Sequence, residues 1–321
     1  MRKEIAPITD SDKRKASIAL FCKGEPSIAD WVNLTGGSYS HNSLLGFRKD
    51  WINFLEFCQL AKVNPLPAAV TTVRRHLEKL AETRKLASIK RCVATLSLIH
   101  RVHQLTDPTR HRQIRFCLQS LGNIKADDAA KTQPFRIEHL EKLQKQIGNS
   151  SRLKDIRDLL IWTLSLEALL KRSELCALEV SDIWFDGNSA NINVDGQTLG
   201  LSDHASTLLN RWFMLTEISD GHLLRRIDRH ENLGSESMDH SSVYRVFRRA
   251  SEMLGLTGEL VFSGQSARAG AALDLSKAGF NLSDIQSQGR WRSPAMPAQY
   301  AGLTGHSEEA FTKHRKKVER E

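Results

Sequence analysis

The chain has 321 residues, of which 40% are hydrophobic, and its 46 lysines and arginines exceed its 37 aspartates and glutamates by a formal charge of +9. This length and composition exclude a disordered chain and favour two folded domains. The positive charge favours a polyanionic partner, with nucleic acid first, an anionic membrane surface second and a merely basic protein as the plain alternative.

The first 38 residues mix charged residues with Pro26 and the pair Gly36-Gly37, which predicts a flexible N-terminal arm. A helix capped by Ser40 is predicted next, because its apolar residues keep a 3.6-residue period until Pro65 and Pro67 end it. Three more helices are predicted over residues 70–80, 88–103 and 109–121. Residues 39–121 are therefore expected to form a helical domain with basic residues on its exposed faces.

The polar segment 122–133 has no apolar period and is predicted to be a linker. Helices are then predicted over 137–147 and 153–171. Residues 189–194 and 197–201 flank Asp195-Gly196, a dipeptide typical of a two-residue β-hairpin turn. Helices resume over 205–217, 241–254, 266–278, 282–288 and 306–318. Residues 134–321 are therefore expected to form a second, mostly helical domain with one small antiparallel sheet.

The five cysteines are widely spaced, none forms a C-x-x-C pair, and most lie in apolar helix-like stretches. We therefore expect free thiols in a reducing compartment rather than disulfides or zinc. The residues after Met1 contain no apolar signal segment, and the longest apolar stretch, Leu159 to Leu170, is too short for a membrane span. These features predict a soluble intracellular protein without a membrane partner.

The stretch from Phe262 to Tyr300 reads FSGQSARAGAALDLSKAGFNLSDIQSQGRWRSPAMPAQY. It resembles the C-terminal signature of the tyrosine recombinases, and of the Cre-like phage and plasmid enzymes in particular. Their pattern is His-x-x-Arg, a helix, Ala-Gly, a second helix, Gly-x-Trp or Gly-His, and a tyrosine nine residues beyond. Gln265 stands at the histidine position, Arg268 at the arginine, and Trp291 at the Trp or His position.

Earlier motifs agree with this resemblance in order and spacing. Asp155-Ile156-Arg157 and the segment 169–175 (LLKRSEL) resemble the box that holds the family's first arginine, and the DG hairpin falls where the family's β2–β3 hairpin should. Residues 86–101 resemble a DNA-facing helix of the N-terminal domain. The resemblance implies a mainly α (α+β) fold, in which a helical core-binding domain and a helical catalytic domain with a small antiparallel sheet close around duplex DNA.

The resemblance also implies a chemistry. In that family a tyrosine attacks a DNA phosphodiester and leaves a 3′-phosphotyrosine, so no cofactor or metal is needed. Two arginines donate to the non-bridging oxygens, a hairpin lysine protonates the leaving 5′ oxygen, and a His and a Trp or His complete the shell. Tyr300 would then be the nucleophile, with Arg268 and Trp291 beside the phosphate. The plain alternatives are a surface ion-pair arginine, a core indole and a packing tyrosine.

The sequence departs from this pattern at three places. Lys171 stands at the first-arginine position, and lysine lacks the planar fork of arginine. Arg172 follows it, but one residue turns a helix by about 100°, so Arg172 cannot replace it unless the helix is locally distorted. Glu174 aligns with an acidic residue of the shell and remains to orient whichever side chain points inward. No Lys or Arg occurs over residues 173–210, so the hairpin lysine is missing, and Gln265 cannot exchange a proton near neutral pH.

Two surfaces are predicted to contact DNA. The helix over 241–254 corresponds to the family helix that enters a major groove, with a solvated basic face as the alternative. We expect its N-terminal half to read base edges and the other domain to contact phosphates. The candidate base-reading residues are His240, Ser241, Tyr244, Arg245 and Arg248. The candidate residues of the other domain are Lys85, Ser88, Lys90 and Arg91.

Two functions remain open. The chain is either an active site-specific recombinase of a mobile element, or a pseudo-recombinase that regulates, represses or organises DNA without cutting it. Tyr300, Arg268 and Trp291 favour the first, whereas Lys171, Gln265 and the base-free hairpin favour the second; a type IB topoisomerase is a distant third. In both cases we expect an inverted-repeat DNA site bound by two protomers, with four in a synapse.

The segment 306–318, with apolar residues Ala310, Phe311 and Val318, is expected to dock into a neighbouring subunit. The protein is expected in a bacterial cytoplasm, associated with the nucleoid, a plasmid or a phage.

Overall fold

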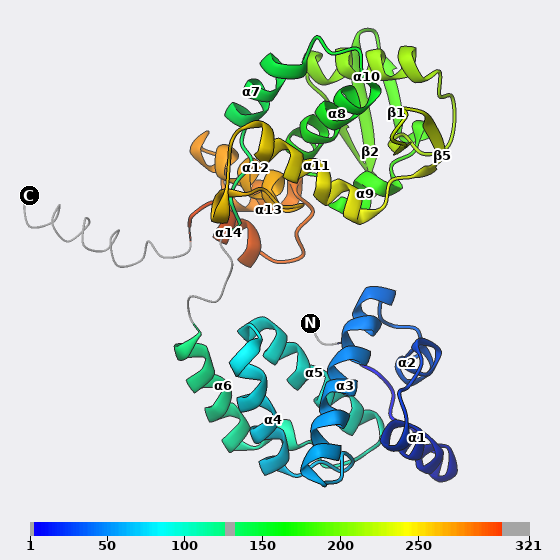
Figure 1. Cartoon of the computed structure of the whole chain (residues 1–321), viewed down its shortest axis with the longest axis vertical. Helices are drawn as coiled ribbons and strands as arrows, with labels where there is room; N and C mark the ends of the chain where they lie inside the picture. Colours follow the sequence, from blue (N-terminus) through cyan, green and yellow to red (C-terminus); the bar gives the residue numbers. More distant parts are fainter. Residues whose placement is uncertain (1–2, 126–131, 304–321) are drawn as a thin grey trace, which may run out of the picture. The chain divides into compact units, whose positions relative to one another are not determined.

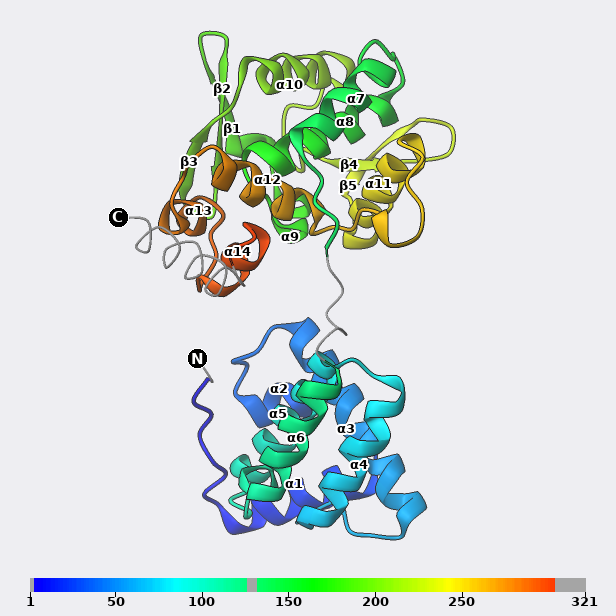
Figure 2. The same cartoon turned by 90° about the vertical axis from the view of Figure 1, so that its left-hand side faces the viewer.

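The computed structural model describes residues 3–125 and 132–303, and the chain divides into an N-terminal unit (Met1–Ala130) and a C-terminal unit (Lys131–Glu321). Each unit has its own hydrophobic core, and both are shown in Figures 1 and 2. Both are mainly helical, and the C-terminal unit also holds a three-stranded antiparallel sheet, which confirms the predicted fold class. None of the helices in the described ranges is long and apolar enough to cross a membrane.

The core of the N-terminal unit is built on four long helices, α3 to α6 (Figure 1). Along α5 (Leu86–Val102), Ile89, Leu96 and Ile99 are fully buried at helical spacing, as their period predicted. A 3₁₀ turn at Pro108–Arg110 leads into the last helix. The bounds of these helices are α3 (His41–Ala61), α4 (Val70–Thr83), α5 (Leu86–Val102) and α6 (Arg112–Ile124).

The predicted flexible arm over residues 1–38 was wrong. It contains two helices, α1 (Ser11–Lys23) and α2 (Ile28–Thr35), whose first turns are capped by the side chains of Asp10 and Ser27. Phe21 and Trp31 are buried, their ring centroids lie 5.2 Å apart, and both belong to the core of the unit. Together with Leu34, these two aromatic rings anchor the segment in the core of the unit.

The C-terminal unit is arranged around α8 (Leu153–Glu167), which lies in the middle of the unit and is buried without interruption from Asp155 to Leu166 (Figure 2). One face of the sheet packs against α10. Asp195 and Gly196 have φ angles of +56° and +78° between paired strands, so the predicted DG hairpin is confirmed. The bounds are α7 (Ile137–Ile147), β1 (Ile183–Asp186), β2 (Ser189–Val194), β3 (Gln197–Gly200) and α10 (Asp203–Thr216).

The helix predicted over 153–171 is interrupted. α8 ends at Glu167, Leu169 takes a left-handed φ of +48°, and a second helix, α9 (Arg172–Ala177), begins after it. A separate two-stranded sheet, β4 (Arg225–Ile227) with β5 (Leu233–Ser237), and a short helix, α14 (Ala295–Tyr300), were not predicted. The remaining helices are α11 (His240–Met253), α12 (Ser266–Lys277) and α13 (Leu282–Gln288).

Two predicted segments fall largely or wholly outside the described residues. α6 continues to Ile124, past the predicted start of the linker at residue 122, and most of the rest of that linker is not described. The docking helix expected over 306–318, with Ala310, Phe311 and Val318, lies outside the described residues.

Candidate functional site

Arg268 lies at the centre of the candidate site and is held by backbone carbonyls. Its side chain is 3% exposed, Nη2 donates to the Gly289 carbonyl at 2.6 Å, and Nη1 donates to the Leu169 carbonyl. Its Cζ lies 4.2 Å from the centroid of the Trp291 ring. Burial lowers the pKa of Arg268 to about 10, so the guanidinium stays charged at neutral pH.

Trp291 connects Arg268 to Tyr300. The Trp291 and Tyr300 ring centroids lie 6.2 Å apart with an interplanar angle of 61°. The indole occupies this place because residue 289 is glycine: a Cβ there would lie 1.9 Å from Trp291 Cζ3. Burial raises the pKa of the Tyr300 hydroxyl, while the charge of Arg268 and a hydrogen bond with Thr132 oppose the rise. The structure thus brings together Tyr300, Trp291 and Arg268, the residues that match the C-terminal part of the family pattern.

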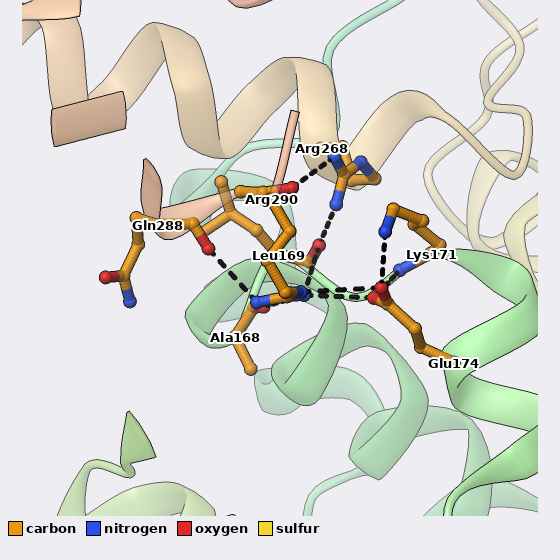
Figure 3. Close-up of polar contacts among 8 residues, drawn as sticks. Ala168, Leu169, Lys171, Glu174, Arg268, Gln288 and Arg290 are labelled. Atoms are coloured by element: carbon orange, nitrogen blue, oxygen red, sulfur yellow. Dashed lines mark hydrogen bonds and ion pairs between the residues drawn. The ribbon is translucent and has the colours of Figure 1, made fainter. Parts of the chain in front are cut away.

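Glu174 forms the second half of the site, on α9 (Figure 3). Its Oε1 lies 2.7 Å from Lys171 Nζ, and its Oε2 accepts from the Lys171 backbone N–H at 2.8 Å and from Arg290 Nη2 at 2.9 Å. Burial raises the pKa of Glu174, but the hydrogen bonds from Arg290 and Lys171 outweigh it and lower the pKa to about 2. The carboxylate is therefore ionised at any pH at which the protein would work.

Arg290 was not among the residues predicted for the site. Its side chain is only 9% exposed, and Nη2 also donates to the Ala168 carbonyl at 2.9 Å. Its backbone has a φ of +53°, a conformation that costs a residue with a Cβ about 1 kcal/mol or more. Arg268 and Arg290 thus approach the same turn between α8 and α9 from two different elements (Figure 3). The sequence could not predict this burial, because a charged residue in a short loop is usually exposed.

The remaining candidate site residue is exposed. Gln265 is the N-cap residue of α12, and within the described residues its side chain makes no hydrogen bond. A cavity of about 510 Å³ beside the β2–β3 turn is lined by Lys171 and Glu174, together with Asp195 of that turn and Asp182 of the 3₁₀ turn that precedes β1. Within residues 3–125 and 132–303, no group of three or more His, Cys, Asp or Glu side chains is placed to hold a metal ion.

The candidate base-reading residues lie together on α11. His240, Ser241, Tyr244, Arg245 and Arg248 are all exposed. A cavity of about 820 Å³ beside them, between α11, the start of α8 and the β4–β5 hairpin, is also lined by Lys154, Arg157 and Arg226. Arg249, in contrast, turns inward, where its Nη1 donates to Asp158 at 2.7 Å and its Nη2 to Asp155.

The candidate contacts of the N-terminal unit lie at the start of α5. Lys85, Lys90 and Arg91 are exposed, and Ser88 is half-buried. The Arg91 guanidinium is already bound to both carboxylate oxygens of Asp50, at 2.8 and 2.9 Å. A cavity of about 400 Å³ brings Ser88 and Arg91 together with two basic residues that were not predicted, Lys49 and Arg84.

Comparison with known proteins gives concordant matches. The chain matches the Phage integrase family over residues 135–306, more than half of its length. It is 24% identical over 281 residues to an integrase/recombinase xerD homolog of Selenomonas ruminantium, with 82% of each chain covered. It is 25% identical over 285 residues to recombinase cre of Escherichia phage P1, with 80% of this chain and 82% of that protein covered.

Among solved structures, XerH site-specific recombinase bound to a palindromic difH substrate, in a post-cleavage complex, is similar in fold. It has a TM-score of 0.66 at 15% identity, with 96% of this chain and 90% of that chain covered.

Proposed function

Because the chain belongs to the phage integrase family of tyrosine recombinases, we propose that it is a site-specific recombinase whose nucleophile is Tyr300. The observation that carries this proposal is the convergence of Tyr300, Trp291 and the buried Arg268 in one place. A phenol normally has a pKa of about 10 and needs a charged environment to attack a phosphodiester. Arg268 supplies a positive charge beside Tyr300.

In the proposed step, the Tyr300 Oη attacks the phosphorus and the bond to the 5′ oxygen breaks. The products are a 3′-phosphotyrosine and a free 5′-hydroxyl, so the phenolic proton is balanced by the proton that the leaving oxygen takes up. Attack by a 5′-hydroxyl reverses the step and rejoins the strand, and therefore no cofactor or external energy source is required. Arg268 would stabilise the charge on the non-bridging oxygens.

We propose that duplex DNA binds across the exposed face of α11 and the start of α5. The five candidate residues of α11 are exposed, and the neighbouring cavity adds Lys154 and Arg226. Lys85, Lys90 and the cavity around Lys49 and Arg84 would contact phosphates from the other unit. A relative of the same fold was solved on a palindromic substrate, which supports an inverted-repeat target.

Self-association on DNA is the third part of the proposal. The C-terminal unit has an apolar cavity of about 540 Å³, lined by Leu166, Leu275, Phe280 and Ile285, and Phe280 is 53% exposed. Segment 306–318 of a second copy, with apolar Phe311 and Val318, is the proposed occupant, and this would build the dimer and tetramer. We propose a cytoplasmic location, on the nucleoid, a plasmid or a phage genome.

Two observations favour a second candidate function, DNA binding without cleavage. The β2–β3 turn, where a lysine would protonate the leaving oxygen, lies in a cavity lined by Asp182 and Asp195 instead, and Gln265 replaces a proton-transferring side chain. Such a pseudo-recombinase would regulate or organise the same DNA site.

The test begins with selection of the bound site from a pool of randomised duplexes. A nicked suicide duplex that carries this site is then incubated with the wild type and with Tyr300→Phe, and covalent adducts are separated under denaturing conditions. Tyr39→Phe is the matched control, since Tyr39 packs on Phe47 in the other unit. We expect an adduct with the wild type and with Tyr39→Phe only. Specific binding with no adduct would rule out cleavage in favour of the second candidate.

A further inference from the structure

The turn between α8 and α9 separates Lys171 from Arg172. Lys171 is the N-cap residue of α9 and has extended backbone angles of −75° and 155°, whereas Arg172 is the first residue of the helix. The two residues therefore do not belong to one continuous helix, and the usual 100° step between helical neighbours does not fix their directions. The side chains of Lys171 and Arg172 therefore have different neighbours.

Lys171 is committed to Glu174. Its Nζ lies 2.7 Å from Glu174 Oε1, and this carboxylate is largely buried with Arg290 on its other oxygen. An incoming phosphate would have to break this ion pair to reach the ammonium group. Lysine would also present a single charge rather than a planar pair of donors.

Arg172 has an unused guanidinium. Within the described residues, its side chain makes no hydrogen bond or ion pair, although it is half-buried rather than extended into solvent. Its Cγ, Cδ and Nε lie along Gly264, where a Cβ would come within 2.3 Å of Arg172 Cδ. The absence of a side chain at residue 264 is what makes room for this stem.

The contact with Gly264 places Arg172 at the N-terminal end of α12. Gln265 follows Gly264 directly, and Arg268 lies three residues further on, so Gln265 and Arg268 share one face of the helix. The Gln265 amide is exposed and, in the described part of the chain, unpaired. Arg172, Gln265 and Arg268 thus provide hydrogen-bond donors at the same helix end, and Trp291 connects this group to Tyr300.

We propose that Arg172 is the second phosphate-binding arginine of this site, and that Lys171 and Arg290 are positioning residues that fix the start of α9 through Glu174. The proposal rests on the proposed function, because its ligand is the DNA phosphodiester that Tyr300 would attack. Arg172 would offer its planar fork to the non-bridging oxygens, a geometry that carboxylates and phosphates accept as two parallel hydrogen bonds.

The test compares Arg172→Ala, Arg172→Lys, Gly264→Ala and Lys171→Ala in the full chain. Gly264→Ala retains Arg172 in the sequence but displaces the aliphatic part of its side chain. Lys277→Ala is the matched control, because it removes one positive charge from the opposite end of α12. The first readout is the rate of adduct formation on the nicked duplex. The second is the binding of orthovanadate alone, followed by line broadening in ⁵¹V NMR, which does not require cleavage. Circular dichroism and affinity for the selected duplex report on folding.

We expect Arg172→Ala to slow adduct formation by about 10²–10³ and to abolish vanadate binding, with Gly264→Ala similar in direction. Arg172→Lys should restore part of the vanadate binding but little of the rate, because it lacks the fork. Lys171→Ala should cost less than about tenfold, and Lys277→Ala should match the wild type.

If the wild type forms no adduct, cleavage fails as a function, but the vanadate series still decides the role of Arg172. Vanadate binding that survives Arg172→Ala and is lost in Lys171→Ala would overturn the assignment. So would a wild type that does not bind vanadate.

Discussion

The two units bury polar side chains for different purposes. In the N-terminal unit they are mostly histidines and hydroxyls that serve the backbone: His100 Nε2 accepts from the Ala68 N–H at 3.1 Å, and its Nδ1 hydrogen-bonds the Leu96 carbonyl. In the C-terminal unit the buried hydroxyls are joined by four buried charged side chains, Asp155, Arg157, Asp158 and Arg268, and the charged groups of this unit form two clusters. One cluster joins α8 to α11 through Asp155, Asp158 and Arg249, and the other is the site around Glu174.

This difference determines how each unit should respond to substitution. A buried ion that loses its partner costs about 3–5 kcal/mol, whereas an exposed cation contributes little to folding. Substitution of a buried charged group in the C-terminal unit should therefore cause a large loss of stability or activity. Changes at the surface cations of the N-terminal unit should be small and graded. Substitutions in the two units can test this contrast.

The largest effect is expected for Arg268→Lys. The single ammonium group of a lysine cannot donate to the Leu169 and Gly289 carbonyls and also bind a phosphate. It also lacks the planar pair of donors that arginine presents. We expect adduct formation to fall by about 10³ or more, while affinity for the selected duplex changes less than about threefold. Single-turnover adduct assays and a binding titration measure the two quantities. An equal loss in both would show that Arg268 serves DNA binding rather than the reaction.

The next effect concerns pH and His76, which is buried in the N-terminal unit with its Nε2 unpaired among the described residues. Burial lowers its pKa from 6.5 to about 4. Below pH 6.5 the unfolded chain takes up a proton that the folded unit refuses until about pH 4, so stability falls across this window by roughly 3 kcal/mol.

Urea unfolding at several pH values, combined with hydrogen exchange in α4, tests this prediction. His76→Phe should make the dependence shallower, and His100 and His103, whose pKa values burial also lowers, should account for part of the dependence that remains. The exposed His41 provides the control substitution, His41→Gln, which should leave the dependence as in the wild type. An unchanged pH profile in His76→Phe would contradict the prediction.

Substitution of one glycine by alanine in each unit should change stability in opposite directions. Gly289→Ala would put a methyl group into the Trp291 ring, with an expected loss of about 1–3 kcal/mol and displacement of the indole from Arg268. Gly122→Ala lies in α6 with nothing within 4 Å of the new Cβ, and should stabilise that helix by about 0.5–1 kcal/mol. Thermal unfolding measures both. A shift of the same sign would weaken the contrast.

The smallest effect is expected for Lys49→Ala and Arg84→Ala. Each removes one exposed cation from the cavity that also contains Ser88 and Arg91. We expect a severalfold loss of affinity for any duplex and a decrease of about 1 in the slope of log affinity against log salt concentration. A loss confined to the selected site would instead indicate direct base reading.

Periodicity and turn chemistry were sufficient for much of the fold. The helices of the N-terminal core and the DG hairpin were predictable because each depends on residues close in sequence. The spacing of Arg268, Trp291 and Tyr300 was equally visible, since a family pattern fixes it. α1 and α2 were not predicted, because their stability depends on Phe21 and Trp31 finding partners elsewhere in the unit.

The break between α8 and α9 was hidden for a different reason. Ala168 to Leu170 is apolar and continues the pattern of α8, so nothing local announces the left-handed residue at 169. The burial of Arg290 follows from that break, because its guanidinium binds the carbonyls that the turn exposes. The departure at Lys171 was visible in the sequence, but its consequence for Arg172 depended on the turn.

The same turn gives the two buried arginines a further role. The last carbonyls of a helix carry the negative end of its macrodipole, and cations there are favourable. Ala168 and Leu169 terminate α8, and Arg290 and Arg268 donate to their oxygens. The longest buried helix of the unit is therefore capped by the site itself. Any ligand that draws on Arg268 would loosen this cap, so occupancy of the site and fraying at the end of α8 should be thermodynamically linked.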